Sequence, residues 1–124
     1  MKRDLDLVRD ILIEIESWSA NIQLKGVEIK GYSHDDVTYN AMLLYDAGYI
    51  DAVISKTMAG DSIYPKSLTW KGCEFLDEAR DKTVWKKAKS VAEEAGASSL
   101  TIFRTILSKV AASRVDDVLS GFIN

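Results

Sequence analysis

Apolar residues recur at helical spacing in the first part of the chain, from about Asp4 to Ser17. They fall every three or four positions, which places them along one side of an amphipathic helix. The residues of this stripe are Leu5, Val8, Leu12 and Ile15. Asp4 suits the N-cap, because a carboxylate there accepts hydrogen bonds from free backbone amides. The pattern predicts a first helix that buries one face.

Residues 18–30 lack helical periodicity. Val27 and Ile29 alternate with charged residues, which favours a short strand, and Gly31 ends it. Ser33 then predicts the N-cap of a second helix, and Gly48 its left-handed C-cap. This helix has a broad apolar face, made of Val37, Ala41, Met42, Leu44 and Tyr45.

Two strand-like runs follow, at Ile50–Lys56 and Ser62–Leu68. The turn-prone segment Met58–Asp61 lies between them, so the pattern predicts a β-hairpin. Proline has no amide hydrogen to donate to a sheet. Pro65 therefore predicts that the second strand is an edge strand or a bulged one.

Helical periodicity resumes after the hairpin and continues to the C-terminus. Thr69 is a suitable N-cap, Asp81 begins a further helix, and Gly96 ends that helix. Ser98 or Ser99 caps the last helix. We expect one domain overall, with residues 1–95 forming its main part. Residues 96–124 form a C-terminal helix that packs on this part or dimerises.

The order helix, strand, helix, hairpin, helix resembles the plan of a winged-helix domain. The segment Leu43–Ile50 is similar to the helix end, with an A-G-L-I motif, that precedes the wing of many such regulators. Leu68–Gly72 is similar to their L-T-x-x-G motif. The resemblance implies an α+β, mainly helical, winged helix-turn-helix-like fold with a β-hairpin wing and extra C-terminal helices. The helix before the hairpin would then be the one presented to a partner.

Two longer motifs indicate a resemblance to a more specific family. Met1–Arg9 reads M-K-R-D-x-D-L-V-R, and Leu68–Asp77 reads L-T-W-x-G-x-E-F-L-D. Both resemble a small uncharacterised bacterial and prophage family, whose members usually have His at the positions of Asn40 and Cys73. The resemblance implies a phage or prophage setting and a role in binding rather than catalysis.

Charge argues against a typical nucleic-acid binder. The net charge of the 124 residues is −3. Residues 1–60 hold 6 basic and 10 acidic side chains, and residues 61–124 hold 10 and 9. Proteins that bind nucleic acids usually have a basic domain or stripe. Because no Lys or Arg lies between Gly31 and Ser55, the second helix has no cation of its own for phosphate.

One Cys and one His exclude a disulfide framework and metal sites built from several of these residues, so we expect no metal and no cofactor. No apolar run approaches the roughly 18 residues of a membrane span. The first residues include acidic ones where a secretory signal would be apolar. These features favour a cytoplasmic protein that does not enter a membrane.

The presented helix supplies the first set of candidate contact residues. Its expected exposed positions are His34, Asp35, Thr38, Tyr39 and Asn40. An exposed Asn40 could read adenine in DNA, with Thr38 and Tyr39 near the backbone. Asp35 would face phosphates, however, so contact with a protein is the favoured interpretation.

The hairpin and a run of basic residues supply two further sets of candidate contact residues. The wing candidates are Lys56, Met58, Asp61, Tyr64 and Lys66. The basic face consists of Lys82, Lys86, Lys87 and Lys89. Helical spacing brings most of these lysines together, so they form either a phosphate-contacting surface or a solvated face balanced by nearby acids.

The last helix predicts a homodimer through residues 98–123. The expected dimer seam is Phe103, Leu107, Val110, Val118 and Phe122. Trp18, Trp70 and Trp85 are expected in the core or in helix packing. A lone cysteine is usually a small buried hydrophobe, and we expect this of Cys73. A nucleophilic pair with His34 is the alternative.

Three functional hypotheses follow. The favoured one is a non-enzymatic winged-helix protein of phage or prophage type that binds another protein and inhibits or modulates a host machine. The second is a dimeric transcriptional regulator that binds DNA. The third is an enzyme that depends on Cys73.

Overall fold

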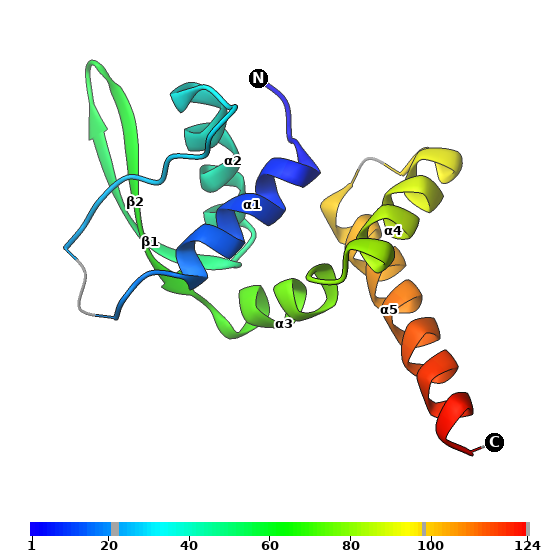
Figure 1. The fold of residues 1–124 in the computed structure, drawn as a ribbon. Coiled ribbons are helices and arrows are strands. Elements are labelled where there is room, and N and C mark those ends of the chain that lie inside the picture. Colours follow the sequence, from blue (N-terminus) through cyan, green and yellow to red (C-terminus); the bar gives the residue numbers. More distant parts are fainter. Residues whose placement is uncertain (21–22, 98, 124) are drawn as a thin grey trace. The chain divides into compact units, whose positions relative to one another are not determined.

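The computed structural model describes residues 1–20, 23–97 and 99–123 (Figure 1). Its elements are α1 (Leu5–Glu16), α2 (His34–Asp46), β1 (Ile50–Thr57), β2 (Gly60–Leu68), α3 (Trp70–Ala79), α4 (Lys82–Ala95) and α5 (Leu100–Ile123). The two strands form an antiparallel hairpin between helices. The protein is therefore α+β and mainly helical, with a winged-helix-like order of elements.

The chain divides into two compact units, residues 1–76 and residues 77–124. The boundary falls within α3. The main part expected from the sequence, residues 1–95 of one domain, includes α4 together with the hairpin. In the structure α4 packs against α5 and belongs to the second unit.

The first unit is built on contacts among α1, α2 and the hairpin. Figure 1 shows α1 beside α2, and α1 also contacts β2. The helix α2 contacts both strands. Buried side chains of this unit include Leu7, Val8, Ile11, Leu12, Val37, Ala41, Leu44, Ile50, Ile63 and Phe75. The rings of Tyr49 and Phe75 lie 5.2 Å apart, so the start of the hairpin is tied to α3.

The expected helix caps are confirmed. The side chain of Asp4 accepts a hydrogen bond from the Leu7 amide, and that of Ser33 accepts one from Asp36. Thr69 accepts from the Gly72 amide at 3.1 Å. These bonds satisfy amides that have no partner within the first turn of a helix.

The caps of the second unit are also as expected. Asp81 accepts from the amides of Thr83 and Val84, at 2.8 and 3.1 Å. Gly96 ends α4 with a left-handed backbone, at φ 65°. Ser99 accepts from the Ile102 amide at 3.5 Å at the start of α5. The alternative cap, Ser98, lies outside the described residues.

The hairpin has the predicted bulge at Pro65. Ala52 pairs with Pro65 while its neighbour Asp51 pairs with Ser67, so Lys66 is the extra residue of β2. The tip is the two-residue segment between Thr57 and Gly60. A bulge next to proline lets the strand continue although Pro65 cannot donate to the ladder.

The strand expected at Val27–Lys30 does not form. Within the described residues the sheet contains β1 and β2 alone. Val27 is buried and Glu28 is exposed, so the alternating pattern predicted the burial of these side chains correctly. Alternation reports which side chains are buried, but a strand also needs a neighbour for its backbone groups.

Two expectations about side-chain burial on α3 are wrong. Trp70 is 81% exposed on the first turn of α3, where its indole nitrogen donates to Glu74. Cys73 is also exposed, on the same helix. The buried side chains of this helix are Phe75, Leu76 and Ala79, so the core lies on the other side of α3.

The second unit is held by α4 against α5. The rings of Trp85 and Phe103 meet edge to face, with their centroids 5.2 Å apart. Glu78 accepts a hydrogen bond from Ser108 at 2.7 Å, and its carboxylate lies 3.7 Å from Arg104. These contacts cover the first half of α5.

Candidate functional site

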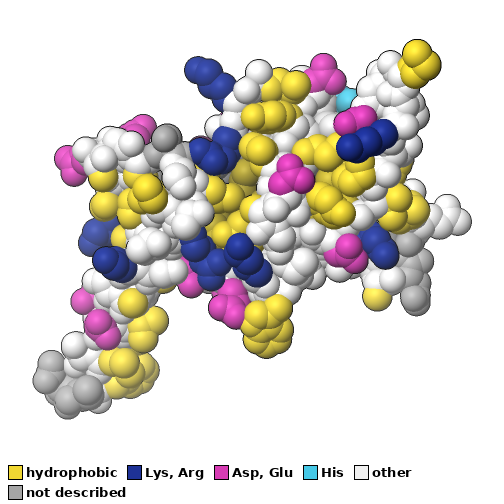
Figure 2. Space-filling view, turned by 180° about the vertical axis from the view of Figure 1, so that it is seen from behind, with side chains coloured by type: hydrophobic (Ala, Val, Ile, Leu, Met, Phe, Trp, Pro, Cys, Tyr) yellow, Lys and Arg dark blue, Asp and Glu magenta, His cyan; other side chains and the backbone are white. Residues whose placement is uncertain are grey.

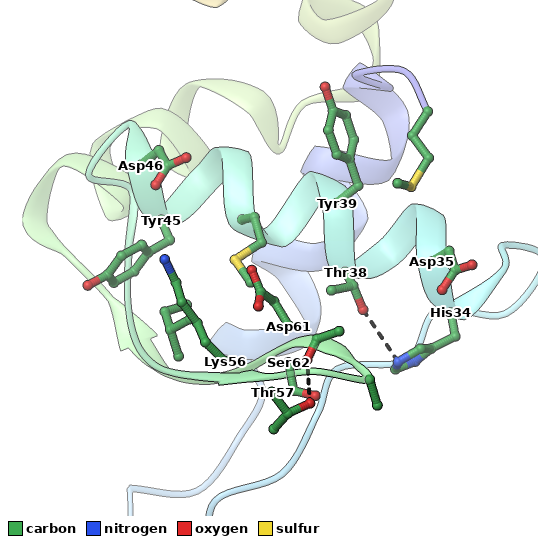
Figure 3. Close-up of a pocket in the computed structure, with 15 residues that line it drawn as sticks. His34, Asp35, Thr38, Tyr39, Tyr45, Asp46, Lys56, Thr57, Asp61 and Ser62 are labelled. Atoms are coloured by element: carbon green, nitrogen blue, oxygen red, sulfur yellow. Dashed lines mark hydrogen bonds between the residues drawn. The ribbon is translucent and has the colours of Figure 1, made fainter.

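A groove of about 1110 Å³ lies between α2 and the hairpin in the first unit (Figure 3). On α2 its lining residues recur at helical spacing: Asp35, Thr38, Tyr39, Met42, Tyr45 and Asp46. They share one side of the helix. The buried residues Val37, Ala41 and Leu44 share another side. One face of α2 therefore holds the core, and a second face lines the groove.

The hairpin forms the opposite wall of the groove. Ile54, Lys56 and Thr57 come from β1, and Asp61 and Ser62 come from β2. Lys56 and Asp61 are direct cross-strand partners, so both side chains lie on the same face of the hairpin. In Figure 3 the side chain of Lys56 extends across the groove on the side of Tyr45.

The lining combines an apolar floor with acidic edges. Met42 and Ile54 are half-buried and come from opposite walls. The carboxylates of Asp35, Asp46 and Asp61 are exposed, against one lysine, Lys56. With His34 neutral, the side chains of the lining carry a net charge of −2.

His34 and Thr38 lie one turn apart at the N-terminal end of α2. Their side chains meet at 3.5 Å between Nε2 and Oγ1. Both line the groove, together with Asp35 and Tyr39. Four of the five residues expected on the presented helix are thus brought together.

The fifth, Asn40, is buried, which corrects the expectation that it is exposed. Its side-chain oxygen accepts from the Asp4 amide at 2.8 Å. Its side-chain nitrogen donates to the carbonyls of Lys2 and Asp36, at 3.2 and 2.9 Å. Asn40 therefore cannot read a base, because its donors and acceptor are used inside the protein.

The wing candidates are only partly in the groove. Lys56 and Asp61 line it, whereas Met58 is fully exposed at the hairpin tip. Lys66 lies at the bulge, 3.8 Å from the carboxylate of Asp51. Tyr64 pairs with Val53, on the face opposite to Lys56. The expected wing set therefore divides between two faces of the hairpin.

The sequence pattern placed Met42 and Tyr45 on one broad apolar face with Val37, Ala41 and Leu44, but did not place them in a candidate site. Both line the groove, and Asp46 and Ile54 join them. The signal that could have found them is the second stripe on the helix, in which Asp35, Thr38, Met42 and Tyr45 follow helical spacing.

The basic face lies in the second unit, on α4. Lys82, Lys86 and Lys87 are exposed, and Lys89 is half-buried. Lys87 also lines a small cavity of about 100 Å³ with Arg114 and Asp117 of α5. The carboxylate of Asp117 therefore lies near the positive charges of Lys87 and Arg114.

The expected dimer seam is wrong in its first half. Phe103 and Leu107 are fully buried within the chain, and Val110 is half-buried beside α4. Val118 and Phe122 are exposed as expected, and Val115 and Leu119 accompany them. Figure 2 shows hydrophobic side chains along this end of α5. The exposed apolar stripe of α5 is therefore Val115, Val118, Leu119 and Phe122.

Cys73 and His34 lie on different elements of the first unit. His34 faces the groove next to Thr38, and Cys73 is not part of the groove lining.

In the described part of the chain, no group of three or more His, Cys, Asp or Glu side chains is placed to hold a metal ion. None of the helices in the described ranges is long and apolar enough to cross a membrane.

Comparison with known proteins places the chain in a family. Residues 2–98 match the family described as "Hypothetical protein (DUF2513)". The chain belongs to this family. A protein of Haemophilus influenzae described as "Uncharacterized protein" is 33% identical to this member over 121 residues, which cover 97% of this chain and 100% of the relative. No solved structure matches the chain significantly.

The part that matches the DUF2513 family contains every residue that lines the groove except Met1. Most of α5, with its exposed stripe, lies beyond it. The groove is therefore a candidate site in the region that defines the family.

Proposed function

We propose that this protein is a non-enzymatic, winged-helix-like binding module that acts by contact with another protein. Its contact surface is the groove between α2 and the hairpin. The observation that carries the proposal is the lining of this groove, which combines half-buried Met42 and Ile54 with tyrosines and exposed carboxylates. Protein interfaces typically combine an apolar centre with a polar rim, and tyrosine is enriched at their strongest contacts.

The charge of the groove supports a protein partner over DNA. In a winged-helix regulator, α2 and the hairpin would approach the duplex. Here that approach would bring Asp35, Asp46 and Asp61 towards phosphates. Neutralisation of phosphates supplies most of the affinity of sequence-independent DNA binding, so this face lacks the main source of that affinity.

The biological setting is part of the proposal. The resemblance of the Met1–Arg9 and Leu68–Asp77 motifs to a bacterial and prophage family favours a phage or prophage protein. The partner would then be a component of a host machine, which the protein inhibits or modulates.

DNA binding as a dimer is the second candidate, and the exposed Lys82, Lys86 and Lys87 on α4 favour it. It predicts binding to short DNA duplexes that falls steeply between about 50 and 200 mM salt. It also predicts further loss of binding on Lys86→Glu with Lys87→Glu. A folded protein that does not bind at the lower salt concentration excludes this candidate.

The main proposal is tested by capture of partners from a bacterial lysate with the purified protein and its variants. We expect a retained protein that is lost on Tyr39→Ala or Asp35→Lys. Asp116→Lys is the matched control, because it makes the same charge change on exposed α5. Retention that is equal for all variants would contradict the proposal. Equal retention by wild type and Cys73→Ser would exclude a role for a cysteine nucleophile in binding.

A further inference from the structure

The groove has a length, a floor and a charge that together define what it can hold. Its lining on α2 runs from Asp35 to Asp46, which spans roughly 16 Å at the rise of an α-helix. One carboxylate lies at each end of this span. Asp61 of the hairpin adds a third from the opposite wall.

The C-terminal end of α2 adds to the negative potential. Helix carbonyls leave a partial negative charge at this end, and the last turn of α2 has no basic residue. Lys71 donates to the Ala47 carbonyl at 3.0 Å, and its ammonium lies over the ring of Tyr49. Lys71 therefore offsets part of this potential from a position outside the groove lining.

Lys56 is the one lysine or arginine side chain among the described residues that line the groove. Its direct cross-strand partner is Asp61, so one acid of the lining lies on the same face of the hairpin as this lysine. The carboxylates at the two ends of α2, Asp35 and Asp46, have no lysine or arginine on their own helix. These two positions are the places where a cation from a partner gains most.

We propose that the groove binds a cationic segment of extended chain, with Lys or Arg on either side of an aliphatic residue. The inference rests on the proposed function and names the chemistry of the partner. Alternate residues of an extended segment point to the same side, so a Lys-x-Leu-x-Lys pattern directs all three side chains into the groove. The lysines are then roughly 13 Å apart, and their long side chains cover the remaining distance to Asp35 and Asp46. The leucine meets Met42 and Ile54.

The test uses two synthetic peptides, Lys-Ser-Leu-Ser-Lys and Glu-Ser-Leu-Ser-Glu, both with blocked ends. Binding is followed by the backbone amide NMR shifts of the full chain, which detect weak complexes. We expect the basic peptide to change the amide chemical shifts of α2 and of the hairpin between Ile54 and Ser62. The acidic peptide should leave these chemical shifts unchanged. Higher salt should weaken the complex, because its charges are exposed.

Charge reversal locates the site. Asp35→Lys with Asp46→Lys should weaken binding of the basic peptide about tenfold, because the change removes both proposed ion pairs and each exposed ion pair contributes a few-fold to affinity. The control is Asp51→Lys with Asp116→Lys, which changes the net charge equally at exposed positions outside the groove. This control should bind within about twofold of wild type.

Each outcome is decisive. Equal shifts with both peptides, shifts outside the groove, or equal loss in both double variants would overturn the inference. If the peptide fails to bind while capture of a partner still depends on Tyr39, the proposed function stands without this inference. If the peptide binds as expected while Tyr39→Ala captures the same proteins as wild type, the groove chemistry stands and the proposed function fails.

Discussion

The side chain of Asn40 accepts a hydrogen bond from the backbone amide of Asp4 at 2.8 Å. The two residues are 36 positions apart, and Asn40 is completely buried. Asp4 in turn caps α1 through the Leu7 amide. One amide side chain therefore joins the start of α1 to the middle of α2, next to the groove.

Replacing Asn40 should destabilise the fold. Asn40→Ala removes the partner of the Asp4 amide and of the Lys2 carbonyl, and a part-buried polar group without a partner is costly. We expect a loss of about 2 kcal/mol in the free energy of unfolding, measured by urea denaturation. Thr38→Ala is the control on the same helix and should change stability by less than about 0.5 kcal/mol. An unchanged urea midpoint for Asn40→Ala would show that the bonds contribute nothing.

Gly72 is required because the backbone of Tyr49 lies against it. A Cβ atom at this position would overlap the Tyr49 carbonyl oxygen, which also accepts from the Thr69 amide. We expect Gly72→Ala to lower the free energy of unfolding by about 3 kcal/mol, since backbone on both sides must move. In contrast, Gly121→Ala has open space around it and should raise the stability of α5 by about 0.5–1 kcal/mol. Thermal unfolding of both variants tests the pair.

Asp81 should make stability depend on pH in the acidic range. The Val84 amide lowers the pKa of this carboxyl below its usual 3.8; burial opposes this effect, and the Thr83 amide and the charge of Arg114 add to it. A carboxyl whose pKa is lower in the folded state stabilises the fold above the unfolded pKa. This stabilisation is lost as pH falls through the folded pKa.

The measurement is a comparison of wild type with Asp81→Asn, which keeps a capping oxygen but does not titrate in this range. We expect the urea midpoint of wild type to fall more than that of Asp81→Asn between about pH 6 and pH 3. Carbon NMR of the Asp81 carboxyl should give a pKa below the ordinary value. Parallel pH profiles for the two proteins would refute the assignment.

The exposed apolar stripe of α5 predicts self-association. Phe122 is 84% exposed, and Val115, Val118 and Leu119 are about half exposed. Burial of such a stripe against a second copy removes apolar surface from water. At tens of micromolar, light scattering should give twice the chain mass of 13.8 kDa. Phe122→Glu should give a monomer, whereas Met58→Glu, at a fully exposed position in the hairpin, should remain dimeric. A monomeric wild type would end this hypothesis.

The ends of the helices and the hairpin could be predicted from the sequence because their causes are local. Asp4, Ser33, Thr69 and Asp81 cap helices through amides no more than three residues away. Gly96 needs only its own backbone conformation to end α4. The bulge at Pro65 follows from a missing amide hydrogen. Such features depend on neighbours in the chain, so single-sequence patterns report them.

The residues of the candidate site could be predicted only in part. Helical spacing brings His34, Asp35, Thr38 and Tyr39 to one face without further information. It cannot decide whether that face meets solvent or another element. Asn40 is adjacent in sequence but faces the start of α1. Met42 and Tyr45 fit a buried stripe equally well by hydropathy.

By itself the sequence determined the helices, their caps and the position of the hairpin, since each follows from interactions within a few residues. Tertiary structure alone decided which faces are covered. Asn40 is buried because α1 packs against α2. Trp70 and Cys73 are exposed because α3 packs through its opposite face. Tertiary structure also formed the groove by placing the hairpin along α2. Burial depends on packing between segments that are distant in sequence. Hydrophobic periodicity within one segment does not indicate which other segments pack against it.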